Sequence, residues 1–252
     1  MNDLVSVIIS TFNGGTYIGE TIQAILGQTT RPREIIVVDD GSTDGTPERI
    51  AAEFGSAVDL RKIAHSGIPA VARNHGIAMA KGSYLAFCDH DDVWLPGKLA
   101  TQLQWMKEHE VGLCGSDALV YGTEERFLGQ YRFRFRSMQR NLAWSNFIIS
   151  SSALVRRDVL GESRFPESAA LRGYDDYVLW LELATRTAVG FIPQPLLQYR
   201  VHDRNLSKEN KDRDPLTQMR ILFSTRTVQR HPFIGFVKMG RFLVAAMLRN
   251  WS

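Results

Sequence analysis

An uninterrupted apolar run, residues 85–88, leads directly into three acids, Asp89, Asp91 and Asp92. Such a run is typical of a strand that is covered on both faces in a parallel sheet. The acids then lie at the carboxyl end of the strand, the edge where open α/β sheets bind ligands. Clustered carboxylates repel one another unless a cation neutralises them, so the pattern predicts Mg²⁺ or Mn²⁺ shared with ligand phosphates. The alternative is a solvated acidic turn before a helix that begins near Pro96.

The preceding residues predict a βαβ unit. A Val- and Ile-rich run at 5–10 predicts a buried first strand, and residues 18–26 repeat apolar side chains at helical spacing. Residues 34–38 predict a second strand that delivers Asp39 and Asp40 at its end. Strand, helix and strand at this spacing indicate a mostly parallel sheet flanked by helices. Further predicted elements are a helix with Thr46 as its N-cap, a strand near 58–60, a helix over 69–80, a helix from Pro96 and a strand over 111–120.

The pattern changes after residue 121. Between 131 and 136 aromatic residues alternate with arginines, a period of two that predicts an amphipathic edge strand or, alternatively, a basic face that contacts a second substrate. Another strand is predicted over 148–155, and a helix opens at Gly173 with Asp175 and Asp176 in its first turn. Acids in a first turn are often only partners of the helix dipole. The pattern alone leaves the role of this pair open.

Composition narrows the class of protein. Of 252 residues, 44% are hydrophobic and 23% are charged, which is ordinary for one globular catalytic domain. The formal net charge of +3 is too small to indicate a nucleic-acid partner. Cys88 and Cys114 have no Cys-x-x-Cys spacing, so a reduced, cytoplasmic location is expected. We find no signal-peptide pattern and no apolar run near the roughly 20 residues that span a bilayer.

Five segments in sequence order resemble family 2 glycosyltransferases, which have the GT-A-type nucleotide-diphospho-sugar transferase fold. The segments are 5–13, 36–44, 72–76 together with 89–92, 175–180 and 199–207. The resemblance covers most of residues 4–207. It implies a catalytic domain over 1–210, with a nucleotide-sugar-binding half at 1–120 and an acceptor-binding half at 121–210.

The resemblance implies a nucleoside site at the first two strands. Ser10, Thr11 and Phe12 would lie around the base, and Asp40 would reach the uracil or its ribose. Arg73 would be a further contact to base or phosphate, which its delocalised charge suits.

The resemblance also implies a metal and a base. The acidic cluster is similar to the family's Asp-x-Asp motif, so Asp91, with Asp89 or Asp92, would hold Mn²⁺ or Mg²⁺ on the diphosphate. His202 stands where some relatives add an imidazole ligand, the alternative being a histidine that a neighbouring carbonyl satisfies. Asp176 matches the general base. Asp175 stands where the family usually has Glu, which bears on acceptor binding.

These roles imply one reaction. The acceptor hydroxyl displaces the diphosphate directly at the anomeric carbon, with inversion, while Asp176 takes its proton and the metal stabilises the leaving group. The sequence lacks the Gln-x-x-Arg-Trp motif of processive synthases, so transfer of one sugar is expected. By resemblance the donor is a UDP-sugar and the acceptor a glycan or lipid-linked glycan of the bacterial surface.

Two other functions are weighed against this one. A nucleotidyltransferase that makes sugar nucleotides also presents acids to a nucleotide and a metal. Such an enzyme normally has a Gly-rich basic loop after its first strand, whereas the loop at 13–15 has no adjacent Lys or Arg. A non-catalytic sugar-nucleotide-binding subunit could lose the catalytic acids without losing its function. All of the expected acids are present in this sequence, which argues against such a subunit. A nucleic-acid-binding module has little support.

The tail at 211–252 is predicted as a basic amphipathic helix. From Arg220 onward there are six Arg or Lys and no acid, and helical spacing separates the basic from the apolar side chains. Such helices lie on anionic membranes, which predicts a protein peripheral to the inner face of the membrane. The alternative is that the apolar stripe packs on the catalytic domain.

Overall fold

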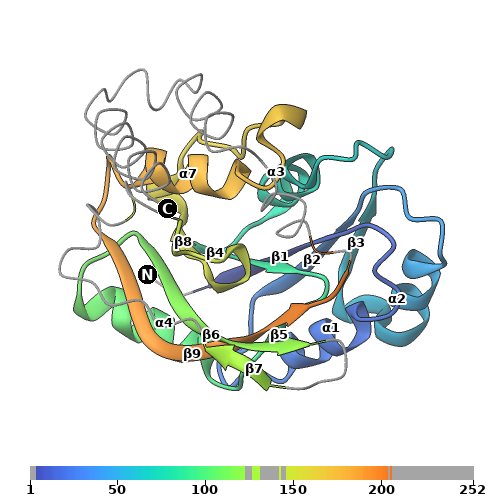
Figure 1. Ribbon diagram of the computed structural model, residues 1–252, viewed down its shortest axis with the longest axis horizontal. Coiled ribbons are helices and arrows are strands. Elements are labelled where there is room, and N and C mark those ends of the chain that lie inside the picture. Colours follow the sequence, from blue (N-terminus) through green and yellow to red (C-terminus); the bar gives the residue numbers. More distant parts are fainter. Residues whose placement is uncertain (1–3, 123–126, 131–141, 143–145, 204, 206–252) are drawn as a thin grey trace, which may run out of the picture.

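The computed structural model describes residues 4–122, 127–130, 142, 146–203 and 205, which form one twisted sheet between two layers of helices (Figure 1). The sheet order is β3-β2-β1-β4-β8-β6-β9-β5, with β7 paired to β6. The strands are β1 Val5–Thr11, β2 Glu34–Asp39, β3 Asp59–Lys62, β4 Tyr84–Asp89, β5 Val93–Trp94, β6 Leu113–Gly122, β7 Phe127–Gln130, β8 Leu154–Arg156 and β9 Val189–Val201.

The first half of the sheet is parallel. β1 pairs in parallel with β2 on one side and with β4 on the other, and β3 extends the sheet beyond β2. From β4 onward the pairing is mixed, since β8 runs antiparallel to β4 and β6 while β9 runs parallel to β6. The predicted α/β sheet flanked by helices is confirmed, with its parallel part confined to β3-β2-β1-β4 and the β6–β9 pair.

Successive side chains of β1 point to opposite faces of the sheet, so they pack in two different hydrophobic cores. Ile8 packs in a core with residues of α3 and α7, whereas Val7 and Ile9 pack in a core with residues of α1, α2 and α4. Figure 1 shows these two groups of helices on opposite faces of the sheet. Burial on both faces explains why the central strands are continuous apolar runs. The helices are α1 Ile18–Leu26, α2 Thr46–Phe54, α3 Pro69–Met79, α4 Lys98–Glu108, α6 Arg157–Leu160 and α7 Asp175–Leu183, with 3₁₀ turns at Gly55–Ala57, Ser150–Ser152 and Ala169–Leu171.

Two helices begin at other residues than predicted, because glycines with positive φ precede them. Thr46 is the first residue of α2 rather than its cap. Gly45 precedes it with φ 82°, and the carboxylate of Asp44 accepts a hydrogen bond from the Thr46 N–H at 3.0 Å. Helix α4 begins at Lys98, after Gly97 with φ 85°, and not at Pro96.

The strand predicted over 148–155 is shorter in the structure. Only Leu154–Arg156 pairs in the sheet, because Ser150–Ser152 turn the chain. The Ser152 Oγ donates a hydrogen bond to the carbonyl of Ile149 at 2.8 Å, a local bond that competes with strand pairing.

Two predictions lie outside the described residues, the alternating segment at 131–136 and the tail at 211–252. Within the described ranges, no helix combines the length and the apolar character that a membrane crossing needs.

Candidate active site

The carboxyl ends of β1, β2 and β4 bring the predicted polar residues to one edge of the sheet. Ser10 is in register with Asp89, and Thr11 is in register with Asp39. Neighbouring parallel strands lie about 4.8 Å apart. The two separately predicted acidic sites are therefore neighbours across β1.

Asp91 and His202 form the candidate metal site. The His202 Nε2 lies 2.8 Å from the Asp91 Oδ2, and the side chains are 10% and 12% exposed. Burial alone would raise the pKa of Asp91, but the hydrogen bond to His202 and the charges of His90 and His202 hold it below its ordinary value. The Nε2 of His202 is thus paired with a carboxylate.

Asp92 lies deeper than its neighbour. Its Oδ1 accepts a hydrogen bond from the Arg200 N–H at 3.0 Å, and its Oδ2 is buried without a hydrogen-bond partner among the described residues. Burial, with the charges of Asp91 and Asp89, raises the pKa of Asp92 well above its ordinary value. A buried carboxylate with an unpaired oxygen is costly unless a cation approaches it.

These donors fit a metal that is shared with a ligand. Within the described residues, no three His, Cys, Asp or Glu side chains are gathered closely enough to hold an ion by themselves. Mg²⁺ usually binds through one or two carboxylates together with substrate phosphates. The Asp91 carboxylate and the His202 imidazole, 2.8 Å apart, could supply two such protein donors, with ligand phosphates completing the shell.

An aromatic platform lies beside the second strand. The ring of Phe12, 40% exposed, stacks on the ring of His65 with centroids 4.1 Å apart and planes inclined by 22°. The Asp40 carboxylate accepts hydrogen bonds from the N–H groups of Ser66 at 2.8 Å and Gly67 at 3.0 Å. Asp40 therefore fixes the loop that carries His65 and retains acceptor capacity for a ligand.

Hydrogen bonds join the first loop to the second. The Asn13 N–H donates to the Ser42 Oγ at 2.8 Å, and the Thr43 N–H donates to the Asn13 Oδ1 at 2.9 Å. Asn13 has φ 50°, a left-handed conformation that Asn tolerates better than most residues. The loop that carries Phe12 is thereby held against the end of β2.

Arg73 connects the two halves of the site. Its guanidinium donates to the Asp89 Oδ1 at 2.7 Å and to the Asp175 Oδ2 at 2.6 Å, and it lies over the ring of Phe165. Arg73 is 7% exposed and Asp175 is 2% exposed. Arg73 thus holds the acids together, a role that the sequence did not reveal, and its predicted contact with base or phosphate stays a prediction.

Asp176 is half-buried at the start of α7 and faces the same group of charges. Its Oδ1 accepts hydrogen bonds from the Tyr177 N–H at 2.6 Å and the Asn146 Nδ2 at 3.3 Å. Desolvation, together with the negative charge of Asp175, raises the pKa of Asp176 to about 7. A carboxylate that titrates near neutral pH is suited to accept a proton from a hydroxyl.

Several residues of the site were missed from the sequence. His65, Ser151 and Asn146 come from loops without a motif, and only folding brings them to the acids. The Ser151 Oγ accepts a hydrogen bond from the Asp89 N–H at 2.9 Å, which explains a serine in a turn beside β4. No local pattern marks such contacts.

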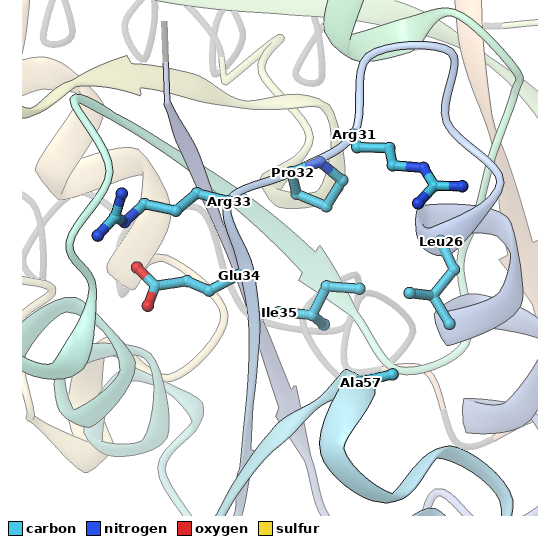
Figure 2. A pocket seen from close by; sticks show the side chains of 7 residues that line it. All are labelled: Leu26, Arg31, Pro32, Arg33, Glu34, Ile35 and Ala57. Carbon is cyan, nitrogen blue, oxygen red and sulfur yellow. The ribbon is translucent and has the colours of Figure 1, made fainter. Parts of the chain in front are cut away.

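A separate cavity of about 330 Å³ lies at the opposite end of β2 (Figure 2). Its lining residues are Leu26, Arg31, Pro32, Arg33, Glu34, Ile35 and Ala57. Glu34 begins this strand, whereas Asp39 ends it. The cavity is therefore distinct from the acidic edge.

The parallel half-sheet, the aromatic platform of Phe12 and His65 and the acids at one edge are typical of a nucleotide-dependent α/β enzyme. The family model "Glycosyl transferase family 2" matches residues 6–164, and the chain belongs to this family. It is therefore a glycosyltransferase, as the motifs predicted.

Two relatives of known name are similar over most of their length. The chain is 30% identical to TuaG of Bacillus subtilis, a glycosyltransferase whose name assigns it to teichuronic acid biosynthesis, over 81% of this chain and 81% of TuaG. It is 30% identical to WfaP of Escherichia coli, named UDP-Glc:alpha-D-GlcNAc-diphosphoundecaprenol beta-1,3-glucosyltransferase, over 92% of this chain and 90% of WfaP.

Solved structures confirm the GT-A-type fold. S. aureus TarS 1-349 superposes with a TM-score of 0.69 at 21% identity, covering 94% of this chain and 71% of TarS. The mannosyltransferase PcManGT from Pyrobaculum calidifontis, solved with GDP-Man and Mn²⁺, superposes with a TM-score of 0.61 at 21% identity, covering 96% of this chain and 75% of that one.

Proposed function

We propose that the protein is an inverting, metal-dependent, non-processive glycosyltransferase that moves one sugar from a UDP-sugar to an acceptor hydroxyl in cell-surface polysaccharide or glycolipid assembly. One observation carries the proposal. Arg73 bonds to Asp89 of the donor side and to Asp175 of the acceptor side. The donor-side acid Asp89 and the acid next to the proposed base, Asp175, therefore lie on either side of one guanidinium.

The nucleoside binds between the first loop and the end of β2 in this proposal. Ser10, Thr11 and Phe12 surround the base, and Phe12 stacks on it. An ionised carboxylate only accepts hydrogen bonds, so Asp40 favours a base that presents an imino N–H. Uracil and guanine present one, and cytosine and adenine present an acceptor at the equivalent position. The uracil of a UDP-sugar donor satisfies this requirement.

The diphosphate lies at the end of β4. Asp91, Asp92 and His202 would hold Mn²⁺ or Mg²⁺, and a bound ion supplies countercharge to the diphosphate as it departs. Asp89 stays paired with Arg73, which offsets the charge of one of the three acids at the end of β4. The Mn²⁺ in the PcManGT complex is consistent with a metal at such a site.

The transfer is a single displacement. The acceptor oxygen forms a bond to the anomeric carbon as the bond from that carbon to the diphosphate oxygen breaks, and the hydroxyl proton passes to the Asp176 carboxylate. The nucleoside diphosphate leaves with the electron pair of the broken bond. Attack from the face opposite the leaving group inverts the anomeric centre. A positioned base contributes roughly 10² to 10⁴ in rate.

The acceptor is proposed to be a glycan or lipid-linked glycan. The name of WfaP gives a diphosphoundecaprenol-linked sugar as its acceptor, which supports the lipid-linked class. The basic tail at 211–252 would then place the enzyme at the inner face of the membrane. Acceptor binding is assigned to the half of the chain that carries Asp175 and Asp176.

Release of nucleoside diphosphate tests the proposed function. Purified protein is incubated with Mn²⁺ and a panel of UDP-, GDP-, ADP- and CDP-sugars, with and without a mixture of undecaprenyl-diphosphate-linked sugars. Release of UDP that rises with acceptor supports transfer. Release of pyrophosphate from a nucleoside triphosphate and a sugar phosphate would instead identify the rival nucleotidyltransferase, and binding without release would identify a non-catalytic subunit.

A further inference from the structure

Arg200 makes a set of contacts that the proposed reaction does not use. It lies at the end of β9 and is 5% exposed. Its Nε donates to the carbonyl of Asp91 at 3.1 Å, and its Nη2 donates to the Glu20 Oε2 at 2.6 Å. Its backbone N–H donates to Asp92. One residue therefore contacts both acids of the candidate metal site.

Tyr17 joins the same group from the start of α1. Its ring lies 4.8 Å from the Arg200 Cζ and stacks on the ring of His202, with centroids 5.3 Å apart and planes inclined by 24°. Two sides of His202 are thus fixed, one by Tyr17 and one by Asp91. We call Arg200, Tyr17 and Glu20 the Arg200 clamp.

The topology explains why such a clamp is needed. β9 ends at Val201, so His202 lies beyond the last paired residue of the strand. β5, which follows the acidic loop, pairs with β9 only through Val93 and Trp94. The longer pairing of β9 with β6 reaches Arg200 and Val201 but stops before His202, so side-chain contacts to Tyr17 and Asp91 orient the His202 ring.

We propose that the Arg200 clamp is a positioning device that holds His202 on Asp91 and so sets the affinity of the site for a divalent ion. This inference rests on the proposed function, because it assumes that Asp91 and His202 are metal ligands. Partners that orient metal ligands typically change metal affinity 10- to 100-fold when mutated. A merely structural Arg200 would affect stability and leave that affinity unchanged.

Mn²⁺ binding to the full chain tests the clamp. Free Mn²⁺ is followed by electron paramagnetic resonance at saturating UDP, and melting temperature is recorded for each variant. Arg200→Lys keeps the charge but loses the two-pronged contact, and Tyr17→Leu loses the ring stack; both should weaken Mn²⁺ binding by about tenfold or more. Tyr17→Phe keeps the stack and should stay within about twofold.

Two control variants and one further clamp variant complete the experiment. Glu48→Gln breaks the exposed pair with Lys62 and should leave Mn²⁺ affinity unchanged. Asp91→Asn removes a proposed ligand and should abolish tight Mn²⁺ binding. Glu20→Gln changes an exposed side chain and should weaken Mn²⁺ binding by about twofold to fivefold.

The outcomes separate the clamp from the metal site. If Arg200→Lys and Tyr17→Leu melt earlier but keep wild-type Mn²⁺ affinity while Asp91→Asn loses it, the clamp is overturned and the metal site stands. If Asp91→Asn also keeps wild-type affinity, the metal site of the proposed function fails and the clamp with it.

Discussion

Asp176 differs from Asp175 and Asp89, because its carboxylate has no hydrogen bond to the Arg73 guanidinium among the described contacts. Asp175, one residue earlier, is paired with Arg73, and Asp89 shares the same cation. Two neighbouring carboxylates thus receive different environments, and burial together with the charge of Asp175 raises the pKa of Asp176 to about 7. Environments of this kind separate acid and base roles in enzymes.

Asp176→Asn should lower sugar transfer by at least about 10²-fold while UDP binding stays near the wild-type value, because the change removes the base but not a donor contact. Asp175→Asn should be milder toward the proton transfer but should release Arg73 from one partner. Kinetics on the productive donor, with calorimetry of UDP binding, measures both. The reverse ranking of the two variants would show that the roles of the pair are exchanged.

The rate of sugar transfer should also rise with pH through about 7, because Asp176 must be ionised to accept a proton. A pH profile of the transfer rate measures this dependence.

The free energy of unfolding should change in the opposite direction and fall as the pH rises. Protonated Asp176 stabilises the fold fully below pH of about 4, the pKa of Asp in an unfolded chain, and this contribution is lost as the pH rises through about 7. Asp176→Asn should therefore gain stability relative to wild type between pH 5 and 8, by roughly 1–2 kcal/mol after screening. Urea denaturation of the wild type and of Asp176→Asn at pH 5 and pH 8 measures this difference. The same difference in free energy of unfolding at both pH values would contradict the raised pKa.

At this scale the sequence identified the acids but not their partners. Asp40, Asp89 and Asp91 follow predicted strands, so their positions indicate the carboxyl edge of the sheet, whereas the family resemblance alone gave Asp176 its predicted role. The stacking of His65 on Phe12 joins residues from different loops, and no periodicity encodes such a contact. The assignments of individual roles stay predictions until variants are measured.

Helix α3 carries Arg73, so its fit against the sheet determines where the guanidinium lies. Gly76 faces β1, and a Cβ built there would lie 2.4 Å from the Cγ2 of Ile8, which is fully packed. Gly19 of α1 offers a contrast. A Cβ at that position would meet only the ends of the Arg49 and Glu53 side chains, at 3.0 and 3.1 Å.

Gly76→Ala should lower stability by about 1–3 kcal/mol, because overpacking against β1 outweighs a helix-propensity gain of about 1 kcal/mol. Gly19→Ala should be neutral or stabilising, since flexible surface side chains can move aside. Urea denaturation of the two variants measures the difference. Equal stabilities would show that α3 tolerates displacement from β1, and Arg73 would then be less firmly placed than the structure indicates.

Helices and strands were predicted well where apolar side chains repeat regularly. Their ends were predicted poorly where a glycine conformation or a side-chain hydrogen bond determines the boundary. The cores of β1, β2, α1 and α3 were all predicted. The starts of α2 and α4 depend on positive φ at Gly45 and Gly97, and the turn at Ser150–Ser152 depends on serine side chains. Such contacts act at single residues and leave no repeat in the sequence.

The whole molecule brings distant segments to one edge. His202 meets Asp91 across 111 positions of sequence, and Arg73 meets Asp175 across 102. Motif order predicted that these residues belong together, but not the antiparallel β8 or the course of β9, since the sequence pattern after residue 121 does not state which strands become neighbours.

Vesicle binding tests the proposed membrane location of the whole chain. The full chain should co-sediment with anionic liposomes at low salt, and a chain ending near Gln218 should not, because each Lys or Arg near such a surface contributes about 1 kcal/mol. The same liposomes without anionic lipid serve as the control. Equal binding by the two chains, or binding by neither, would remove the tail as an anchor.

The central claim is that the acids at the end of β4 bind UDP through a divalent ion. Without the ion these acids repel the diphosphate. Calorimetry of UDP binding with Mn²⁺ and in EDTA tests this claim most directly, with Asp91→Asn beside the wild type. EDTA should weaken UDP binding of the wild type by about tenfold or more. Asp91→Asn should lose most of the gain in UDP affinity that Mn²⁺ gives the wild type. Equal UDP affinity of the wild type in Mn²⁺ and in EDTA would contradict the central claim.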